Sequence, residues 1–243
     1  MPTTSSRFLA ATVVVIVAVT FANQSRHEAA ISGELATQQR TVAELQKRLD
    51  TALTDWSAIA AIAEPSVVTI EAGDSLGSGW VAHADPGNAE IITNFHVVAE
   101  TWSGGTASVQ VRQGDHTWPG TIEQVDRGDD LAVIHVAQHM RALTPATQRP
   151  KLGTTVMAVG SPLGLDGTIS IGIVSGYRSL GGINYMQFTA AISPGNSGGP
   201  VIDSRGRVVA IASAKLVYPG AEALSLGIPV QVACDSFVVC KTS

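Results

Sequence analysis

Dense charge, runs of basic residues and C-x-x-C pairs are all missing from this sequence, and each absence excludes a class of protein. Charged residues make up only 14% of the 243 residues, whereas apolar residues make up 45%. A disordered chain needs the opposite balance, so the composition indicates a folded chain with a sizeable core. The net charge is −5, without a basic run, which argues against nucleic acid as a partner.

Cysteine is nearly absent, with only Cys234 and Cys240 near the end of the chain. Their spacing indicates neither a zinc site nor a thioredoxin-like site, and we expect no metal or other cofactor. In an oxidising compartment the two cysteines either close a small disulfide or remain free thiols. Side-chain geometry decides between these alternatives, and the spacing alone does not.

Glycine, in contrast, is frequent, and its 24 residues often separate short runs of Val, Ile and Thr. This pattern is typical of short strands joined by tight turns. The strands expected cover residues 66–71, 78–83, 89–94, 107–112, 116–125 and 131–136 in a first set, and 154–160, 168–176, 183–190, 200–203, 208–213 and 223–229 in a second. There is little room for helices between them. We therefore predict an all-β fold of two packed six-stranded antiparallel barrels, divided near residues 145–150.

The N-terminus carries an apolar run, residues 8–22, preceded by Arg7. Fifteen residues are short for a spanning helix, which needs about 20, although polar neighbours at the interfaces could extend it. The same features fit a cleavable signal peptide, while the position at the extreme N-terminus disfavours a buried core helix. Residues 1–24 are therefore expected to be a transmembrane anchor or a signal peptide, with the rest of the chain membrane-anchored or secreted, outside the cytoplasm.

Residues 25–58 are expected to form a coiled-coil stalk. Apolar residues recur there at alternating spacings of four and three, at Ile31, Leu35, Gln38, Val42, Leu45, Leu49, Ala52 and Trp56, with Gln38 as a polar exception. Such heptads join helices from separate copies, so a dimer or trimer is expected. The alternative is one amphipathic helix lying on its own domain.

The first motif with chemical meaning is GNSGGP, residues 195–200. A nucleophilic serine needs an exposed hydroxyl on a tight turn, with backbone N–H groups aimed at the developing oxyanion. Ser197 is placed for that role, Gly195 can turn its N–H outward, and Gly198 and Gly199 let the substrate backbone pass closely. A simple glycine turn is the alternative interpretation.

Two further motifs lie upstream. In TNFHVV, residues 93–98, His96 follows an apolar strand, where a general base could be held rigidly. In DDLAVIHV, residues 129–136, Asp130 opens a strongly apolar strand, where a carboxylate is costly to bury unless it is hydrogen-bonded. A solvated turn acid is the alternative, and it suits Asp129 better than Asp130.

Together these segments resemble the trypsin-like serine peptidases, most closely the HtrA (Deg) branch. The similar segments are GSGWVAHADPGNAEIITNFHVV, MAVGSPLG, TISIGIVSG, SPGNSGGP and LSLGIP, in the order of that branch, within about residues 62–230. The resemblance implies a chymotrypsin-like protease domain over residues 59–243. Its first barrel would cover about residues 62–140 and its second about 150–233.

By the same resemblance, Ser197 is the nucleophile of a serine endopeptidase, and His96 is the general base and then the acid. Asp130 orients the imidazole without taking its proton. The turn of Gly195, Asn196 and Ser197 would supply the oxyanion hole, chiefly through the N–H groups of Gly195 and Ser197. Substrates would be proteins or peptides.

The resemblance also outlines a pocket for the substrate residue before the cut bond. Its expected lining is Ala191, Ile192, Ala212, Ser213, Ala214 and Leu226, with Gly227 behind. None of these residues is acidic, so a substrate Arg or Lys would be an unpaired buried cation. We expect cleavage after small or medium aliphatic residues, preferably in unfolded or extended segments.

The sequence departs from the family at a few points. Phe95 stands where a polar residue is usual, and we expect no PDZ domain after the last expected strand. Asn196 replaces the aspartate that pairs with a newly cut N-terminus in digestive relatives. We therefore expect activity without cleavage of a pro-segment, and control through the loops at 163–168 and 178–184.

Three other functions compete with this one. A catalytically silent protease fold could act as an anchored binding or chaperone-like module, but binding alone requires none of the three catalytic residues. An α/β-hydrolase would need G-x-S-x-G and a histidine after the serine. A purely structural coiled-coil protein would explain only the first 58 residues.

Overall fold

The computed structural model describes residues 24, 31–35, 37–45, 54–161, 167–215 and 224–237. The chain divides into two compact units, residues 1–54 and 55–243. In the first unit, residues 31–35 and 37–45 are helical, and Ile31, Leu35, Val42 and Leu45 are exposed there. The expected membrane segment at 8–22 lies outside the described residues. Within the described ones, no helix combines the length and apolar composition needed to cross a membrane.

The second unit begins with helix α2 (Trp56–Ala63) and a short 3-10 turn, η1 (Glu64–Ser66). Asp55 caps α2, because its side chain accepts hydrogen bonds from the N–H groups of Ser57 and Ala58, both at 3.1 Å. Trp56 packs against the core of this unit. The heptad pattern had included Trp56 in the stalk, so the expected boundary after residue 58 falls inside a helix that belongs with the barrels.

The first barrel contains six antiparallel strands and closes in the order β1-β2-β3-β6-β5-β4. Its strands are β1 (Val67–Ala72), β2 (Ser75–Asp85), β3 (Asn88–Thr93), β4 (Ser108–Gln113), β5 (His116–Asp126) and β6 (Leu131–Val136). One helix, α3 (Phe95–Ser103), connects β3 to β4. Apolar side chains that alternate along each strand fill the barrel interior.

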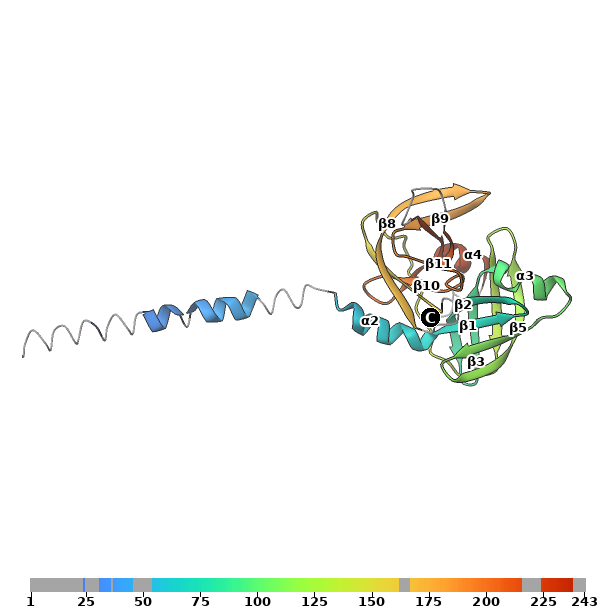
Figure 1. Ribbon diagram of the computed structural model, residues 1–243, viewed down its shortest axis with the longest axis horizontal. Coiled ribbons are helices and arrows are strands. Elements are labelled where there is room, and N and C mark those ends of the chain that lie inside the picture. The colour runs from blue at the N-terminus through green and yellow to red at the C-terminus, as the bar shows by residue number, and fades with distance from the viewer. Residues whose placement is uncertain are drawn as a thin grey trace, which may run out of the picture. The chain divides into compact units, whose positions relative to one another are not determined.

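The second barrel closes in the order β10-β11-β12-β9-β8-β7. Its strands are β7 (Thr155–Gly160), β8 (Thr168–Leu180), β9 (Ile183–Phe188), β10 (Pro200–Ile202), β11 (Val208–Lys215) and β12 (Ser225–Pro229), and helix α4 (Val230–Ser236) follows. Figure 1 shows β8 and β9 as a long hairpin. Residues 178–184, expected to be a control loop, form the end of this hairpin, whereas 163–166 lie outside the described residues.

The two barrels share an apolar interface. Trp80 and Ile92 of the first barrel belong to one buried cluster with Phe188 and Ile211 of the second. Burial of such large side chains is the main favourable contribution to folding. The prediction of two six-stranded antiparallel barrels is therefore confirmed.

The sequence patterns did not predict the helices within the barrel unit. The sequence of α3, FHVVAETWS, begins with β-branched valines that also suit a strand, and packing of Val97 and Val98 against the first barrel core decides in favour of the helix. Helix α4 carries Cys234, which is disulfide-bonded. Cys240, the other cysteine, lies outside the described residues.

Candidate active site

A histidine–aspartate pair lies where strands β3 and β6 meet the same edge of the first barrel. Thr93 pairs with Ala132 at that edge, so the residue after each strand end comes close to the other. Asn94 occupies the N-cap of α3, and His96 lies in the first turn of that helix. Its Nδ1 is 2.8 Å from Oδ2 of Asp130. The first turn of α3 and the turn before β6 therefore hold the two side chains next to rigid strands, as a catalytic pair requires.

The Asp130 carboxylate has an unusually complete set of donors. Its Oδ1 accepts from the backbone N–H of His96 at 2.9 Å, and its Oδ2 accepts from Ser213 Oγ at 3.1 Å in addition to the imidazole contact. Its own carbonyl accepts from Asn94 Nδ2 at 2.9 Å and from Phe95 N at 3.1 Å. These hydrogen bonds compensate for the burial of the carboxylate, whose side chain is only 17% exposed.

Asp130 also has a backbone φ of 54°, the only positive φ among the described non-glycine residues. Aspartate is one of the few residue types that enter this left-handed region with moderate frequency. The bonds to its carbonyl hold the turn in place. This conformation lets the chain bring the carboxylate to His96 and then continue directly into β6.

Ser197 lies on a turn that is tied to both barrels. Its carbonyl accepts a hydrogen bond from Ser78 N at 2.8 Å, and Ser78 Oγ donates to the carbonyl of Gly195 at 2.6 Å. Ser78 Oγ also accepts from Ser161 N at 2.9 Å. Since Ser78 is fully buried in β2, one serine of the first barrel anchors the serine turn of the second.

The glycines of this turn are required by its geometry. Gly195 and Gly198 have φ values of 97° and 88°, which L side chains rarely adopt. A Cβ atom on Gly198 would lie 2.1 Å from the carbonyl oxygen of Ser78. The N–H of Asn196 donates to Ser193, whereas those of Gly195 and Ser197 have no acceptor among the described residues. Two neighbouring N–H groups thus remain available to an oxyanion.

The hydroxyl of Ser197 donates to the carbonyl oxygen of Ser213 at 2.9 Å and makes no hydrogen bond with His96 in this structure. Ser213 therefore touches both halves of the site, because its hydroxyl donates to Asp130. The sequence had suggested Ser213 only as a wall of the substrate pocket. Its hydroxyl is directed instead at the carboxylate beside His96.

Tyr185 of β9 is a further neighbour that the sequence did not indicate. Burial, followed by the charge of Asp130, raises the pKa of Tyr185, while a hydrogen bond with Ser213 opposes that rise. No local pattern marks Tyr185, Ser78 or Ser213 as part of this site. Each is recognised only when the two barrels are seen packed together.

The residues expected to line a pocket lie shortly before Ser197 in the chain and on strands β11 and β12. Ile192, Ala212 and Leu226 are buried, whereas Ala191 is exposed. Ala214 and Gly227 lie on the paired strands β11 and β12. The carbonyl of Ala191 accepts from Ser170 Oγ at 2.5 Å. No acidic side chain occurs among these residues.

The other four histidines that the structure describes in the barrels lie outside this arrangement. His83 and His135 contact carboxylates, at Asp85 and Glu90 respectively. His116 stacks on Trp118, and His139 contacts the carbonyl of Asp85. Within the described residues, the only group of three side chains close enough to hold a metal ion is Glu90, Glu123 and His135.

Comparison with known proteins adds to this geometry. A family model described as a trypsin-like peptidase domain matches residues 77–211. The chain is 32% identical over 167 residues to the putative serine protease HhoB of Synechocystis sp. and 36% identical over 168 residues to the mitochondrial serine protease HTRA2 of Drosophila virilis. Each match covers 65% of this chain and 38% of the relative, so this chain spans well under half of either relative's length.

Solved structures resemble the fold. The crystal structure of the Rv3671c protease in an inactive form matches with a TM-score of 0.64 and 24% identity, over 76% of this chain and 93% of that one. A mutant of the same protein from M. tuberculosis H37Rv, also inactive, matches with a TM-score of 0.63. At this level of identity the likeness concerns the arrangement of the barrels.

Proposed function

Because this chain belongs to the family of trypsin-like peptidase domains, we propose that it is a serine endopeptidase whose catalytic residues are His96, Asp130 and Ser197. The observation that carries the proposal is the His96–Asp130 contact of 2.8 Å at a strand edge of one barrel. The serine turn is tied to that barrel through Ser78. The similarity to HtrA-type serine proteases supports the same conclusion.

In this proposal Ser197 Oγ attacks the carbonyl carbon of the substrate peptide bond while His96 takes the hydroxyl proton. The protonated His96 then gives that proton to the leaving amine, and an acyl-enzyme remains on Ser197. Water repeats the cycle by attacking the ester, with His96 again accepting and returning a proton. Asp130 keeps the Nδ1 of His96 protonated, so that Nε2 is the atom exchanging protons with Ser197 and the substrate.

The oxyanion would be stabilised by the N–H groups of Gly195 and Ser197. These two donors have no acceptor among the described residues, so substrate binding costs no existing hydrogen bond there. Preorganised donors of this kind typically contribute a factor of about 10²–10³ in turnover. The side chain of Asn196 has no part in this step.

Ser197 must first exchange its hydrogen bond with the carbonyl of Ser213 for one with His96. Rotation about its Cα–Cβ bond makes that exchange, and catalytic hydrogen bonds often tighten only when substrate is bound. The hydroxyl is then positioned by the base. A catalytically silent binding module remains the second candidate, favoured by the same Ser197–Ser213 bond.

For specificity we propose cleavage after Val, Ala, Ile, Leu or Thr. The pocket residues Ile192, Ala212 and Leu226 are apolar, and no carboxylate lies among the pocket residues to pair with a substrate cation. Discrimination among aliphatic residues should be shallow, about 10–200-fold for one methylene. Sequencing of cut sites in a denatured protein mixture tests this, and a majority of cuts after Arg or Lys would contradict it.

We also propose that the chain acts outside the cytoplasm as an oligomer that residues 25–54 hold together. Support comes from the apolar run at 8–22 and from the exposure of Ile31, Leu35 and Val42 on a helix that carries heptads. Sedimentation of residues 25–243 beside residues 54–243 is the test. Equal oligomeric states at equal concentration would reject the stalk.

The test of the proposed activity is reaction with a serine-directed phosphonate probe, followed by mass spectrometry of the modified peptide. Modification of Ser197 in the wild type, and its absence in Ser197→Ala and His96→Ala, is the expected result. Ser193→Ala provides a control, because Ser193 is an exposed serine on the same turn. Casein cleavage retained by Ser197→Ala above a tenth of the wild-type rate would contradict the proposal.

A further inference from the structure

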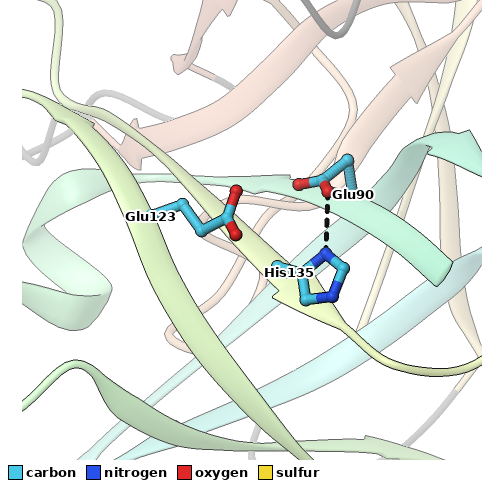
Figure 2. A group of neighbouring side chains, drawn as sticks. All are labelled: Glu90, Glu123 and His135. Carbon is cyan, nitrogen blue, oxygen red and sulfur yellow. Dashed lines mark hydrogen bonds and ion pairs between the residues drawn. The ribbon is translucent and has the colours of Figure 1, made fainter.

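Away from the proposed catalytic residues, three side chains on adjacent strands of the first barrel point toward one another. They are Glu90 of β3, Glu123 of β5 and His135 of β6, and Figure 2 shows both carboxylates turned toward the imidazole. One ligating atom from each lies within 4.8 Å of the other two. His135 Nδ1 is 2.8 Å from Glu90 Oε1.

The strand register explains how this convergence arises. Glu90 lies directly opposite His135 in the β3–β6 pair. Glu123 is the extra residue of a β-bulge, because Ile122 pairs with Ile134 and Gln124 with Val133. A bulge re-aims the side chain of the inserted residue. Thr121 lies opposite His135, so Glu123, two residues further along β5, lies on the same face of the sheet as His135.

The charges in this cluster are not balanced. Glu90 Oε2 is buried and has no hydrogen-bond partner in the part of the chain that the structure describes, whereas a buried carboxylate oxygen is ordinarily paired. The carboxylate of Glu123 comes close to the same group, with one oxygen within 4.8 Å of the ligating atoms of Glu90 and His135. A positive charge between the two carboxylates would relieve both the missing contact and the repulsion.

We propose that Glu90, Glu123 and His135 bind a divalent transition-metal ion, and that zinc(II) fits best. Zinc takes imidazole nitrogen and carboxylate oxygen at about 2.0–2.2 Å, so two ligands of one ion lie at most about 4.4 Å apart. A small movement of the exposed Glu123 closes the remaining gap. Magnesium and calcium prefer oxygen ligands alone. Water would occupy the fourth position.

The sequence did not indicate this site, because it holds no cysteine-based metal motif, and no metal was expected. The cluster is distinct from the proposed catalytic residues. His135 lies in β6, five residues beyond Asp130 in the turn before that strand, which corresponds to roughly 16 Å for extended chain. The ion would join β3, β6 and β5, two of which lead to His96 and Asp130 at the other edge. Its expected effect is stabilisation of the first barrel.

The test uses the metal-stripped protein, titrated with zinc chloride in a calorimeter and then heated with and without a hundredfold excess of zinc over the dissociation constant. We expect one zinc per chain in this cluster and a rise of several degrees in unfolding temperature. Magnesium should produce neither. Glu123→Gln and His135→Asn should each weaken binding at least tenfold.

Matched controls keep the result specific. Glu100→Gln and His116→Gln change an exposed glutamate and an exposed histidine of the same barrel outside the cluster, and zinc binding should stay within twofold of the wild type. His96→Ala should also retain this binding, which separates the cluster from the proposed catalytic pair. In metal-free protein, Glu123→Gln should unfold at no lower temperature than wild type, because it removes a repelling charge beside Glu90.

Several outcomes would overturn the proposal. These are the absence of zinc binding, binding that Glu123→Gln leaves unchanged, and binding that disappears with His96→Ala. The result does not depend on peptidase activity. If the protein binds zinc but does not react with the phosphonate probe, the proposed metal site stands and the proposed peptidase function is wrong.

Discussion

Two of the histidine–carboxylate pairs in the first barrel share an Nδ1–oxygen distance of 2.8 Å, His96 with Asp130 and His135 with Glu90. His96 with Asp130 lies at the edge of the barrel, where helix α3 begins. His135 with Glu90 lies on neighbouring strands. The distance does not distinguish them, so their different chemistry must come from what surrounds each pair.

The surroundings differ mainly at the carboxylate. Asp130 receives a backbone N–H, an imidazole and the hydroxyl of Ser213. Among the described residues Glu90 accepts a hydrogen bond only from the imidazole of His135, and a second carboxylate, Glu123, comes near it. A carboxylate whose oxygens all accept hydrogen bonds holds an imidazole in one orientation and one tautomer. A carboxylate with an oxygen that accepts no hydrogen bond, next to a second carboxylate, favours the binding of a cation.

The largest expected difference between the pairs concerns the histidines. His96→Ala should lower turnover of a peptide substrate by a factor on the order of 10⁶, as loss of a general base does. His135→Ala, compared in metal-free buffer, should stay within about threefold of wild type, because it touches no reacting atom. Turnover of both variants on one peptide substrate, with circular dichroism to verify folding, decides this. Comparable losses from both would remove the functional distinction between the pairs.

Substitution of the two carboxylates should also affect turnover unequally, although the difference should be smaller than for the two histidines. Asp130→Asn should lower turnover by about 10⁴, because an amide in this position favours the wrong imidazole tautomer. Glu90→Gln keeps the shape of the side chain and should leave turnover nearly unchanged. If Asp130→Asn retained more than a tenth of wild-type turnover, Asp130 would not be the orienting group.

The next test concerns the hydroxyl of Ser213, which donates to Asp130 and has no counterpart at Glu90 among the described residues. Ser213→Ala removes one of the hydrogen bonds to Asp130 and should lower kcat/KM roughly tenfold, since a bond to a charged group contributes about 1.5–3 kcal/mol and the other donors remain. Ser236→Ala is the matched control. It also removes a serine-to-aspartate bond, to Asp126 at 2.9 Å, and should leave kcat/KM unchanged.

The smallest effect is expected on the free energy of unfolding, from substitution of Asp129, which neighbours Asp130 in the chain. Burial, followed by the charge of Asp126, raises the pKa of Asp129. The folded protein therefore binds this proton more tightly than the unfolded chain does, and wild-type stability falls as pH rises through that carboxyl range. Asp129→Asn should be more stable at neutral pH by less than about 1 kcal/mol.

The stability difference between Asp129→Asn and the wild type should depend on pH. Below about pH 3, where the carboxyl is protonated in both states, the stability advantage of Asp129→Asn should vanish. Urea unfolding at neutral and acidic pH measures both quantities. A variant less stable than wild type at neutral pH would show that Asp129 makes a favourable contact instead.

Much of the fold could be predicted because strands carry a local signature. Apolar runs such as residues 131–136 and the glycine turns between the runs place the strands within a few residues of the observed bounds. Helix α3 was missed because Val97 and Val98 suit either structure, and packing against the barrel decides between them. The bulge at Glu123 was missed because one inserted residue leaves no mark on a short pattern.

The candidate catalytic residues divide in the same way. His96, Asp130 and Ser197 each stand in a short motif, and the resemblance of those motifs to the HtrA branch predicts the three residues as a set. Ser78 and Ser213 stand in no such motif, yet Ser78 bonds Gly195, a residue 117 positions away. Such partners are determined by how one barrel packs on the other, and local sequence carries no signal for that.

By itself, then, the sequence determined the strands, their division into two sets and the order of the three motifs. Each of these depends on residues that are neighbours in the chain. Only the tertiary structure decided which donors complete Asp130, where Ser197 places its hydroxyl and that Glu123 meets Glu90. These contacts join distant residues, and they depend on strand register, bulges and interface packing, which the whole barrel sets cooperatively.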